Sequence, residues 1–170
     1  MNLEFILSRF SHNADTIASL VQDNAPEQAK WRPQPEAWSL LETINHLYDE
    51  EREDFRVRLD LLLHQSEADW PPIDPDGWVT ARAYNERDLS TSLYNFLQER
   101  QKSLDWLRGL AEPDWESGKK APWGGIMRAG DMLAAWLAHD HLHIRQLNEL
   151  HYAYWAQTAD PYAVRYAGEW

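Results

Sequence analysis

Apolar residues recur at helical spacing in four long stretches, and this periodicity constrains the fold more than any other feature of the sequence. In the first stretch, the steps between apolar residues are three, four and seven, at Leu3, Ile6, Phe10, Ile17 and Val21. Such steps place the side chains on one face of an α-helix, which can then pack against a core. We expect helices near residues 2–23, 39–64, 88–111 and 131–151, and therefore an all-α four-helix bundle.

The predicted helices carry recognisable start and stop signals. Ser39 and Glu42 have the spacing of a capping box, in which a hydroxyl and a carboxylate bind exposed backbone amides at a helix start. Asp88 or Ser90 can cap the third helix, and Pro26 follows the first. These signals favour helix starts at about residues 39 and 88.

Two long connections flank the third helix. Residues 65–87 and 112–129 each contain several prolines or glycines, so we expect irregular structure there. Connections of this length can cross a bundle end to end. Most of the ten tryptophans lie in or beside the connecting stretches, where their rings either pin a loop to the core or line a pocket. No repeat or linker divides the 170 residues, which predicts one domain over residues 1–170 whose aromatic end packs back on the bundle.

The composition excludes several classes of function. With 28 acidic against 16 basic residues, the net charge of −12 would repel nucleic acid. The absence of cysteine excludes disulfides, zinc–thiolate sites and catalysis by a protein thiolate. The amino terminus lacks the pattern of a signal peptide, and no run approaches 18 apolar residues. We therefore expect a cytoplasmic chain that does not bind membranes.

The segment "LAHDHLHIRQL", residues 137–147, packs three histidines into five positions. On a helix, His139 and His143 share a face, whereas His141 lies about 200° from His139. On a strand, all three would share a face, but the preceding "MLAAWLA" favours a helix. The pair supplies two imidazole nitrogens, and a catalytic metal site usually has three protein ligands. A third ligand must come from another helix.

His46 is the best candidate for this third ligand. It lies about 10 Å along the second helix, and the midpoint of His139 and His143 lies about 15 Å from the end of the fourth. Antiparallel packing would bring the three to one level, although a parallel offset would also allow it. The alternative is that these are ordinary core or surface histidines, and the residues alone favour neither interpretation.

The acidic run "DEERED", residues 49–54, follows His46. We predict that most of it forms a solvated helix face. Glu50 is the exception, because it lies one turn beyond His46 and could accept a hydrogen bond from a ligand or take a proton from bound water, which makes it our candidate catalytic residue. Gln146 could hydrogen-bond within the same site, although a surface position is the simpler interpretation.

The segments "WSLLETINHLYDEERE" and "HDHLHIRQL" resemble the DinB-like (DinB/YfiT) superfamily of metal-dependent enzymes, over about residues 38–147. The resemblance implies an up-down-down-up four-helix bundle, commonly a homodimer, with one divalent metal on His46, His139 and His143. It also implies no DNA binding, in agreement with the acidic charge. Relatives often carry a histidine directly before the last ligand, where this chain has Leu142, so we assign His141 no role.

The resemblance implies a thiol-dependent reaction, in which a metal-bound low-molecular-weight thiol is the nucleophile transferred to an electrophilic small molecule. A metal-bound water would instead give hydrolysis of a small molecule. Zn²⁺ or Ni²⁺ suits imidazole ligands, and metal affinity should fall below about pH 6.5 as free imidazole becomes protonated. The alternative is a metal-binding or ligand-binding bundle without turnover. An open coordination position beside a pocket would favour an enzyme, whereas a fourth protein ligand would favour a structural metal.

Overall fold

The computed structural model describes residues 1–65 and 67–168 and is mostly helical. Its long helices are α1 (Leu3–Val21), α3 (Leu40–Asp49), α4 (Arg56–His64), α6 (Leu89–Arg108) and α7 (Ala129–Thr158). A π-helical segment, Glu50–Phe55, joins α3 to α4, so that these three elements form one continuous helix. The last helix runs past the predicted end near residue 151, because residues 152–158 contain neither glycine nor proline to stop it.

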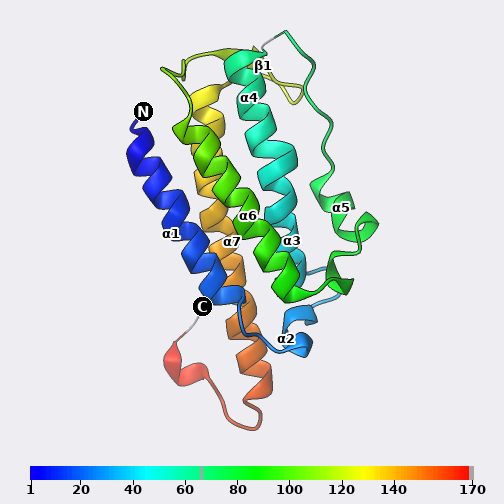
Figure 1. The fold of residues 1–170 in the computed structure, drawn as a ribbon. Helices are drawn as coiled ribbons and strands as arrows, with labels where there is room; N and C mark the ends of the chain where they lie inside the picture. Colours follow the sequence, from blue (N-terminus) through cyan, green and yellow to red (C-terminus); the bar gives the residue numbers. More distant parts are fainter. Residues whose placement is uncertain (66, 169–170) are drawn as a thin grey trace.

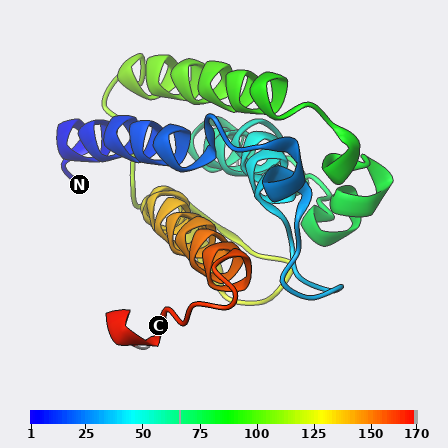
Figure 2. The ribbon, with the colours of Figure 1, turned by 90° about the horizontal axis from the view of Figure 1, so that it is seen from below.

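The four long helices lie side by side in the arrangement of a bundle (Figure 1). In this view α1 and α7 descend, whereas α3–α4 and α6 ascend. α6 contacts α1 and α3, and α7 contacts α1 and α4; Figure 2 shows α6 and α7 on opposite sides of α1. Because α7 runs antiparallel to α3–α4, the middle of α3 and the middle of α7 come to the same level.

The helix starts use the predicted caps. The Ser39 hydroxyl accepts a hydrogen bond from the Glu42 amide at 3.1 Å, and the Glu42 carboxylate accepts one from the Ser39 amide at 2.9 Å. Asp88, rather than Ser90, caps α6 by accepting from the Thr91 amide at 2.8 Å. A cap of this kind contributes about 1 kcal/mol and fixes where each helix begins.

The connections contain more structure than the sequence predicts. They include the short helices α2 (Pro26–Lys30) and α5 (Pro75–Ala81), a 3₁₀ turn at Tyr84–Glu86, and an antiparallel hairpin of β1 (Gly118–Lys120) and β2 (Ile126–Arg128). The expectation of purely irregular connections was wrong, because short elements leave no long periodic pattern. Asp74 caps α5 by accepting from the Gly77 amide at 3.1 Å, and Gly124 and Gly125 supply the positive φ angles of the hairpin turn.

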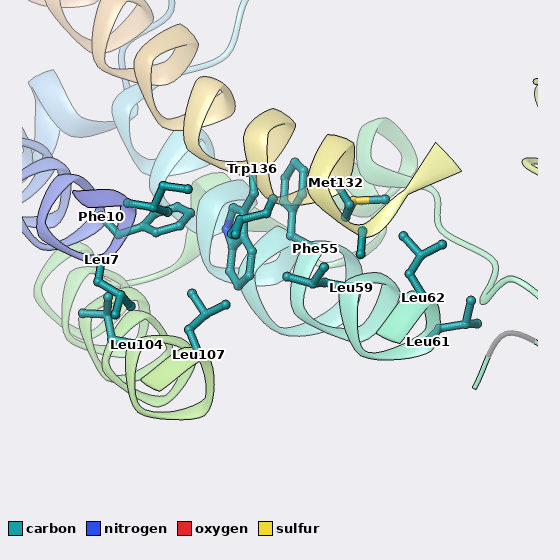
Figure 3. Packing of buried hydrophobic residues seen from close by; sticks show 13 residues of the cluster. Leu7, Phe10, Phe55, Leu59, Leu61, Leu62, Leu104, Leu107, Met132 and Trp136 are labelled. Carbon is teal, nitrogen blue, oxygen red and sulfur yellow. The ribbon is translucent and has the colours of Figure 1, made fainter. Parts of the chain in front are cut away.

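Two apolar clusters fill the bundle. The first gathers Phe10, Phe55, Leu59 and Trp136 from α1, the continuous second helix and α7, as Figure 3 shows. The Phe55 and Trp136 rings are parallel within 5°, with centroids 5.8 Å apart. The second cluster lies toward the other end, around Ile17, Leu41, Ile44, Phe96 and Leu147. Each large buried side chain stabilises the fold by about 1.5–3 kcal/mol, so the two clusters hold the long helices together.

The acidic run 49–54 lies mostly inside the protein, which corrects the expectation of a solvated face. Asp49, Glu50, Glu51 and Asp54 are each at most 7% exposed. Asp49 accepts hydrogen bonds from Arg52, Arg82 and Tyr84 in the following helices and turns. Arg82 and Tyr84 lie 33 and 35 positions further along the chain, and for this reason the local charge pattern does not reveal the burial.

The carboxyl-terminal segment does not pack back on the bundle as predicted. Tyr162 and Tyr166 are 79% and 104% exposed. Figures 1 and 2 show that the last turns of α7 and the segment after them extend past the end of the bundle. Residues 169 and 170 lie outside the described part of the chain. None of the described helices is both long and apolar enough to cross a membrane.

Candidate metal centre

Three histidines from two helices converge at the centre of the bundle. The Nε2 atom of His139 lies 3.3 Å from Nε2 of His46 and 3.0 Å from Nε2 of His143. One ligand nitrogen from each of the three rings lies within 4.8 Å of the others. Nitrogens bound to one tetrahedral zinc ion at about 2.0–2.1 Å are separated by about 3.3–3.4 Å, so this cluster has the dimensions of a metal site.

The helices explain the convergence. His139 and His143 are one turn apart on α7 and face α3, where His46 lies at the same level because the helices are antiparallel. His141 points away and is exposed, as helical geometry predicts. The remaining histidines lie elsewhere: His12 and His64 bind groups on their own helices, and His151 donates to the Leu20 carbonyl at 2.6 Å.

The three rings are neutral when no metal is bound. Burial lowers the pKa of His46 to about 3 and that of His139 to about 2, and the neighbouring imidazoles add to both shifts. Burial also lowers the pKa of His143, against the opposing effect of its hydrogen bond to Gln146. The imidazole nitrogens that would bind a metal are therefore unprotonated at neutral pH. Competition by protons is expected at a lower pH than the value of 6.5 for free imidazole.

Gln146 fixes the orientation of one ring. The Nδ1–H group of His143 donates to Oε1 of Gln146 at 2.7 Å, because an amide oxygen can only accept. This assignment leaves Nε2 of His143 without a proton and directed at the other two rings. The simpler interpretation of Gln146 as a surface residue is therefore wrong.

Two buried polar atoms near the cluster have no hydrogen-bond partner among the described residues: Nδ1 of His46 and Oε1 of Glu50. Glu50 follows His46 by one turn and is 4% exposed. Burial raises the pKa of Glu50 to about 8, and the charge of Asp54 and the hydrogen bond to it act in the same direction. At neutral pH, this carboxyl pair therefore retains a proton.

Asp54 and Arg58 continue the same face of the helix. Burial raises the pKa of Asp54, whereas the charge of Arg58 opposes the rise. Asp54 Oδ1 lies 2.7 Å from Arg58 Nε, which is close enough for an ion pair although poorly aligned for a hydrogen bond. The Arg58 guanidinium also lies over the rings of Trp70 and Trp123, which cover it from the two long connections.

A pocket of about 570 Å³ opens beside the histidine cluster, with His143 and Trp38 in its wall. The Trp38 ring centroid lies 4.8 Å from that of His46, and the ring is parallel to that of His143 within 3°. The Phe55 ring packs against another of the three imidazoles, with its centroid 5.0 Å from that of His139. Sequence reasoning raised pocket-lining tryptophans only in general terms. Trp38 was identifiable only through its position directly before the capping box.

A second polar centre borders the histidines. Arg100 is 2% exposed and binds the carboxylates of Glu51 and Asp140 through contacts of 2.7–2.9 Å. Asn13 donates to Asp140, and the Trp136 indole donates to Glu51, each at 3.1 Å. Asp140 directly follows His139, and Glu51 directly follows Glu50. This network ties all four long helices together at the level of the cluster, and the sequence pattern did not reveal it.

Comparison with known proteins agrees with this architecture. The family model of the DinB superfamily matches residues 9–147. A solved structure, YfiT from Bacillus subtilis, superposes with a TM-score of 0.77 at 19% sequence identity, covering 87% of this chain and 85% of YfiT. YfiT is described as "a probable metal-dependent hydrolase with an unusual four-helix bundle topology". No curated protein matches. The superposition shows a shared four-helix bundle fold, and the family match covers most of the chain, which therefore belongs to the DinB superfamily.

Proposed function

We propose that this protein is a metal-dependent enzyme, and specifically a hydrolase of a small molecule. The observation that carries the proposal is the convergence of three histidines beside a pocket, with His143 in the wall of that pocket. Among the described residues, the cluster contains no fourth His, Asp or Glu ligand that would close a tetrahedral shell. A three-ligand set with a position open toward a pocket is typical of catalytic rather than structural zinc sites.

His46, His139 and His143 would hold the metal through their Nε2 atoms, and Zn²⁺ or Ni²⁺ suits this all-imidazole set. A divalent ion held there would act as a Lewis acid on a group that enters from the pocket. Gln146 keeps His143 in the required tautomer through the 2.7 Å hydrogen bond. Trp38 packs against His46 and Phe55 packs against His139, and these contacts restrict the positions of the two imidazoles.

Glu50 is our candidate for proton transfer. The sequence suggested that Glu50 acts as a base, but the raised pKa of Glu50 favours the protonated carboxyl near neutral pH. We therefore assign the Glu50–Asp54 pair the role of a proton store, which can donate a proton to a leaving group and recover it from the attacking nucleophile. Arg58, beside Asp54, limits the negative charge that the pair develops.

Hydrolysis is favoured over thiol transfer by the description of YfiT, whose bundle this chain shares. The test is a screen of the Zn²⁺-loaded and Ni²⁺-loaded protein against ester, amide and thioester substrates, with and without added thiols. We expect metal-dependent hydrolysis without thiol, lost in His143→Ala and retained in His141→Ala. Turnover only with a thiol would make the protein a transferase instead. Tight metal binding without any turnover would support the non-catalytic bundle.

A further inference from the structure

The pocket beside the histidines has an acidic wall. Glu36 and Glu149 both line it, and no lysine or arginine is among the described residues of its lining. His143, the third titratable group in the wall, is one of the three proposed metal ligands. The lining therefore presents negative charge or none to any ligand, apart from the metal itself.

Two arginines that adjoin lining residues in the sequence, Arg145 and Arg32, do not reverse this charge. Arg145 pairs with Glu149 at 3.0 Å and is 71% exposed, so it offsets one of the two carboxylates from outside the pocket. Arg32 pairs with Glu42, the capping residue of α3. Glu36, in contrast, makes no ion pair with any residue that the structure describes. One carboxylate at the pocket thus remains uncompensated.

The rest of the wall is apolar and aromatic. Trp38 and Leu150 contribute its large side chains, with Pro33, Ala37 and Ala153 between them. Such a surface suits a flat apolar group, and a tryptophan face also attracts a cation within about 6 Å of its centroid. The amide of Gln146 remains able to donate to a ligand, because only its oxygen is used by His143.

Glu149 lies six residues beyond His143 on α7, about 9 Å along the helix axis, so the pocket has a histidine end and an acidic end. At the histidine end, a divalent ion on three neutral imidazoles would be the largest local charge and would attract an electron-rich group such as a carbonyl oxygen or a thiolate. At the far end, the carboxylates repel an anion and attract an ammonium group. A ligand that suits both ends therefore carries an electron-rich group at one end and a positive charge at the other.

We propose that the substrate of this enzyme is an amine-bearing small molecule, with its reactive electron-rich group at the histidines, a flat apolar middle against Trp38, and its ammonium group toward Glu36 and Glu149. This inference rests on the proposed function for the metal end only. It excludes substrates and thiol co-substrates that carry a carboxylate or phosphate at the far end.

The test uses three thiols of matched shape as probes: 4-(aminomethyl)benzenethiol, 4-methylbenzenethiol and 4-mercaptophenylacetic acid. Each is titrated by calorimetry into Zn²⁺-loaded protein whose metal content has been measured. We expect the ammonium probe to bind about tenfold more tightly than the carboxylate probe, with the neutral probe between them. Glu36→Gln should reduce this ratio about threefold, and Glu36→Gln with Glu149→Gln should abolish it.

Glu4→Gln is the matched control, because it removes one charge from the first turn of α1 and should leave the ratio unchanged. Equal or tighter binding of the carboxylate probe to the wild type, or an unchanged ratio in the double variant, would overturn the proposal.

A second measurement separates this inference from the proposed function. Benzylamine and phenylacetate, which lack the thiol, are compared by ligand-observed NMR with metal-free protein. A preference for benzylamine that the double variant loses supports the amine assignment even if zinc is not taken up or no thiol binds to it. Tighter binding of phenylacetate overturns the assignment, whatever the metal does.

Discussion

The Arg100 centre and the histidine centre lie side by side in the same bundle, and their polar groups are satisfied to very different degrees. All five N–H donors of Arg100 have acceptors, on Glu51, Asp140 and the Phe10 carbonyl. Although burial disfavours its charge, the two carboxylates raise the pKa of Arg100. In the histidine centre, by contrast, Nδ1 of His46 and Oε1 of Glu50 have no partner among the described residues.

This difference distinguishes a centre that stabilises the fold from a centre that is able to bind a ligand. A buried network in which every group is paired stabilises one arrangement of helices and leaves no donor or acceptor free to bind a ligand. A buried cluster of neutral, closely spaced nitrogens costs solvation free energy without compensation, and a bound ion would provide that compensation. The first centre therefore positions the second: it fixes the rotation of α7 and of the continuous second helix, on which all three histidines lie.

Removal of Arg100 should give the largest effect on stability. Arg100→Met leaves two buried carboxylates without their cation, and we expect the free energy of unfolding of the metal-free protein to fall by about 3–5 kcal/mol. Chemical denaturation measures it. The control is Arg108→Met, which breaks an exposed pair with Asp105 and should cost less than about 1 kcal/mol. Similar losses in both variants would show that the buried network is not structural.

The histidine centre should contribute to stability only through its metal. Zn²⁺ at 100 times its dissociation constant should stabilise the wild type by about 2.7 kcal/mol, because it binds the folded state alone. In His143→Ala this gain should vanish, whereas His141→Ala should keep it. Thermal unfolding with and without Zn²⁺ measures the difference. An equal gain in both variants would place the metal elsewhere.

The buried carboxyl pair predicts a distinct dependence on pH. The folded pKa of Glu50 is raised, so its contribution to stability is fully present below the unfolded value near 4.5 and is lost as pH rises toward about 8. Glu50→Gln removes this dependence on pH. The free energy of unfolding of the metal-free variant, relative to that of the wild type, should therefore rise by on the order of 2 kcal/mol between pH 5 and pH 8. A constant difference across this range in denaturation experiments would contradict the shared proton.

Gln146 should have the smallest of these effects. Gln146→Ala leaves the three ligands intact but removes the acceptor of His143 Nδ1–H, and loss of such a partner weakens metal binding by about tenfold or somewhat more. Competition with a chelator measures the affinity. Gln101→Ala, on the exposed face of α6, is the control and should leave the affinity unchanged. An unaltered affinity in Gln146→Ala would show that His143 needs no orienting partner.

The sequence predicted what local periodicity controls. The stripe of Ile6, Phe10 and Ile17 and the box of Ser39 and Glu42 located the first two long helices, and the four-residue spacing of His139 and His143 placed them on one face. These inferences need only the geometry of one helix. The antiparallel packing that sets His46 opposite the pair was implied by the family resemblance, because the residues alone also allowed a parallel offset.

The sequence pattern did not predict the burial of side chains whose partners lie far away in the chain. Nothing near Glu51 or Asp54 shows that these carboxylates lie inside, because Arg100 and the covering Trp70 and Trp123 come from other parts of the chain. The π-helical turn at Glu50–Phe55 also has no simple sequence signal. The pocket wall combines residues more than 100 positions apart in the sequence, such as Trp38 and Leu150, so its acidity appeared only in the fold.

Mass spectrometry of the purified wild type, His139→Ala and His141→Ala measures their metal content and directly tests whether the three histidines bind a metal. We expect one divalent ion per chain in the wild type and in His141→Ala, and none in His139→Ala, because His139 directs its Nε2 at the other two ligands whereas His141 is exposed. Loss of the metal in His141→Ala with retention in His139→Ala would contradict the assignment of the site.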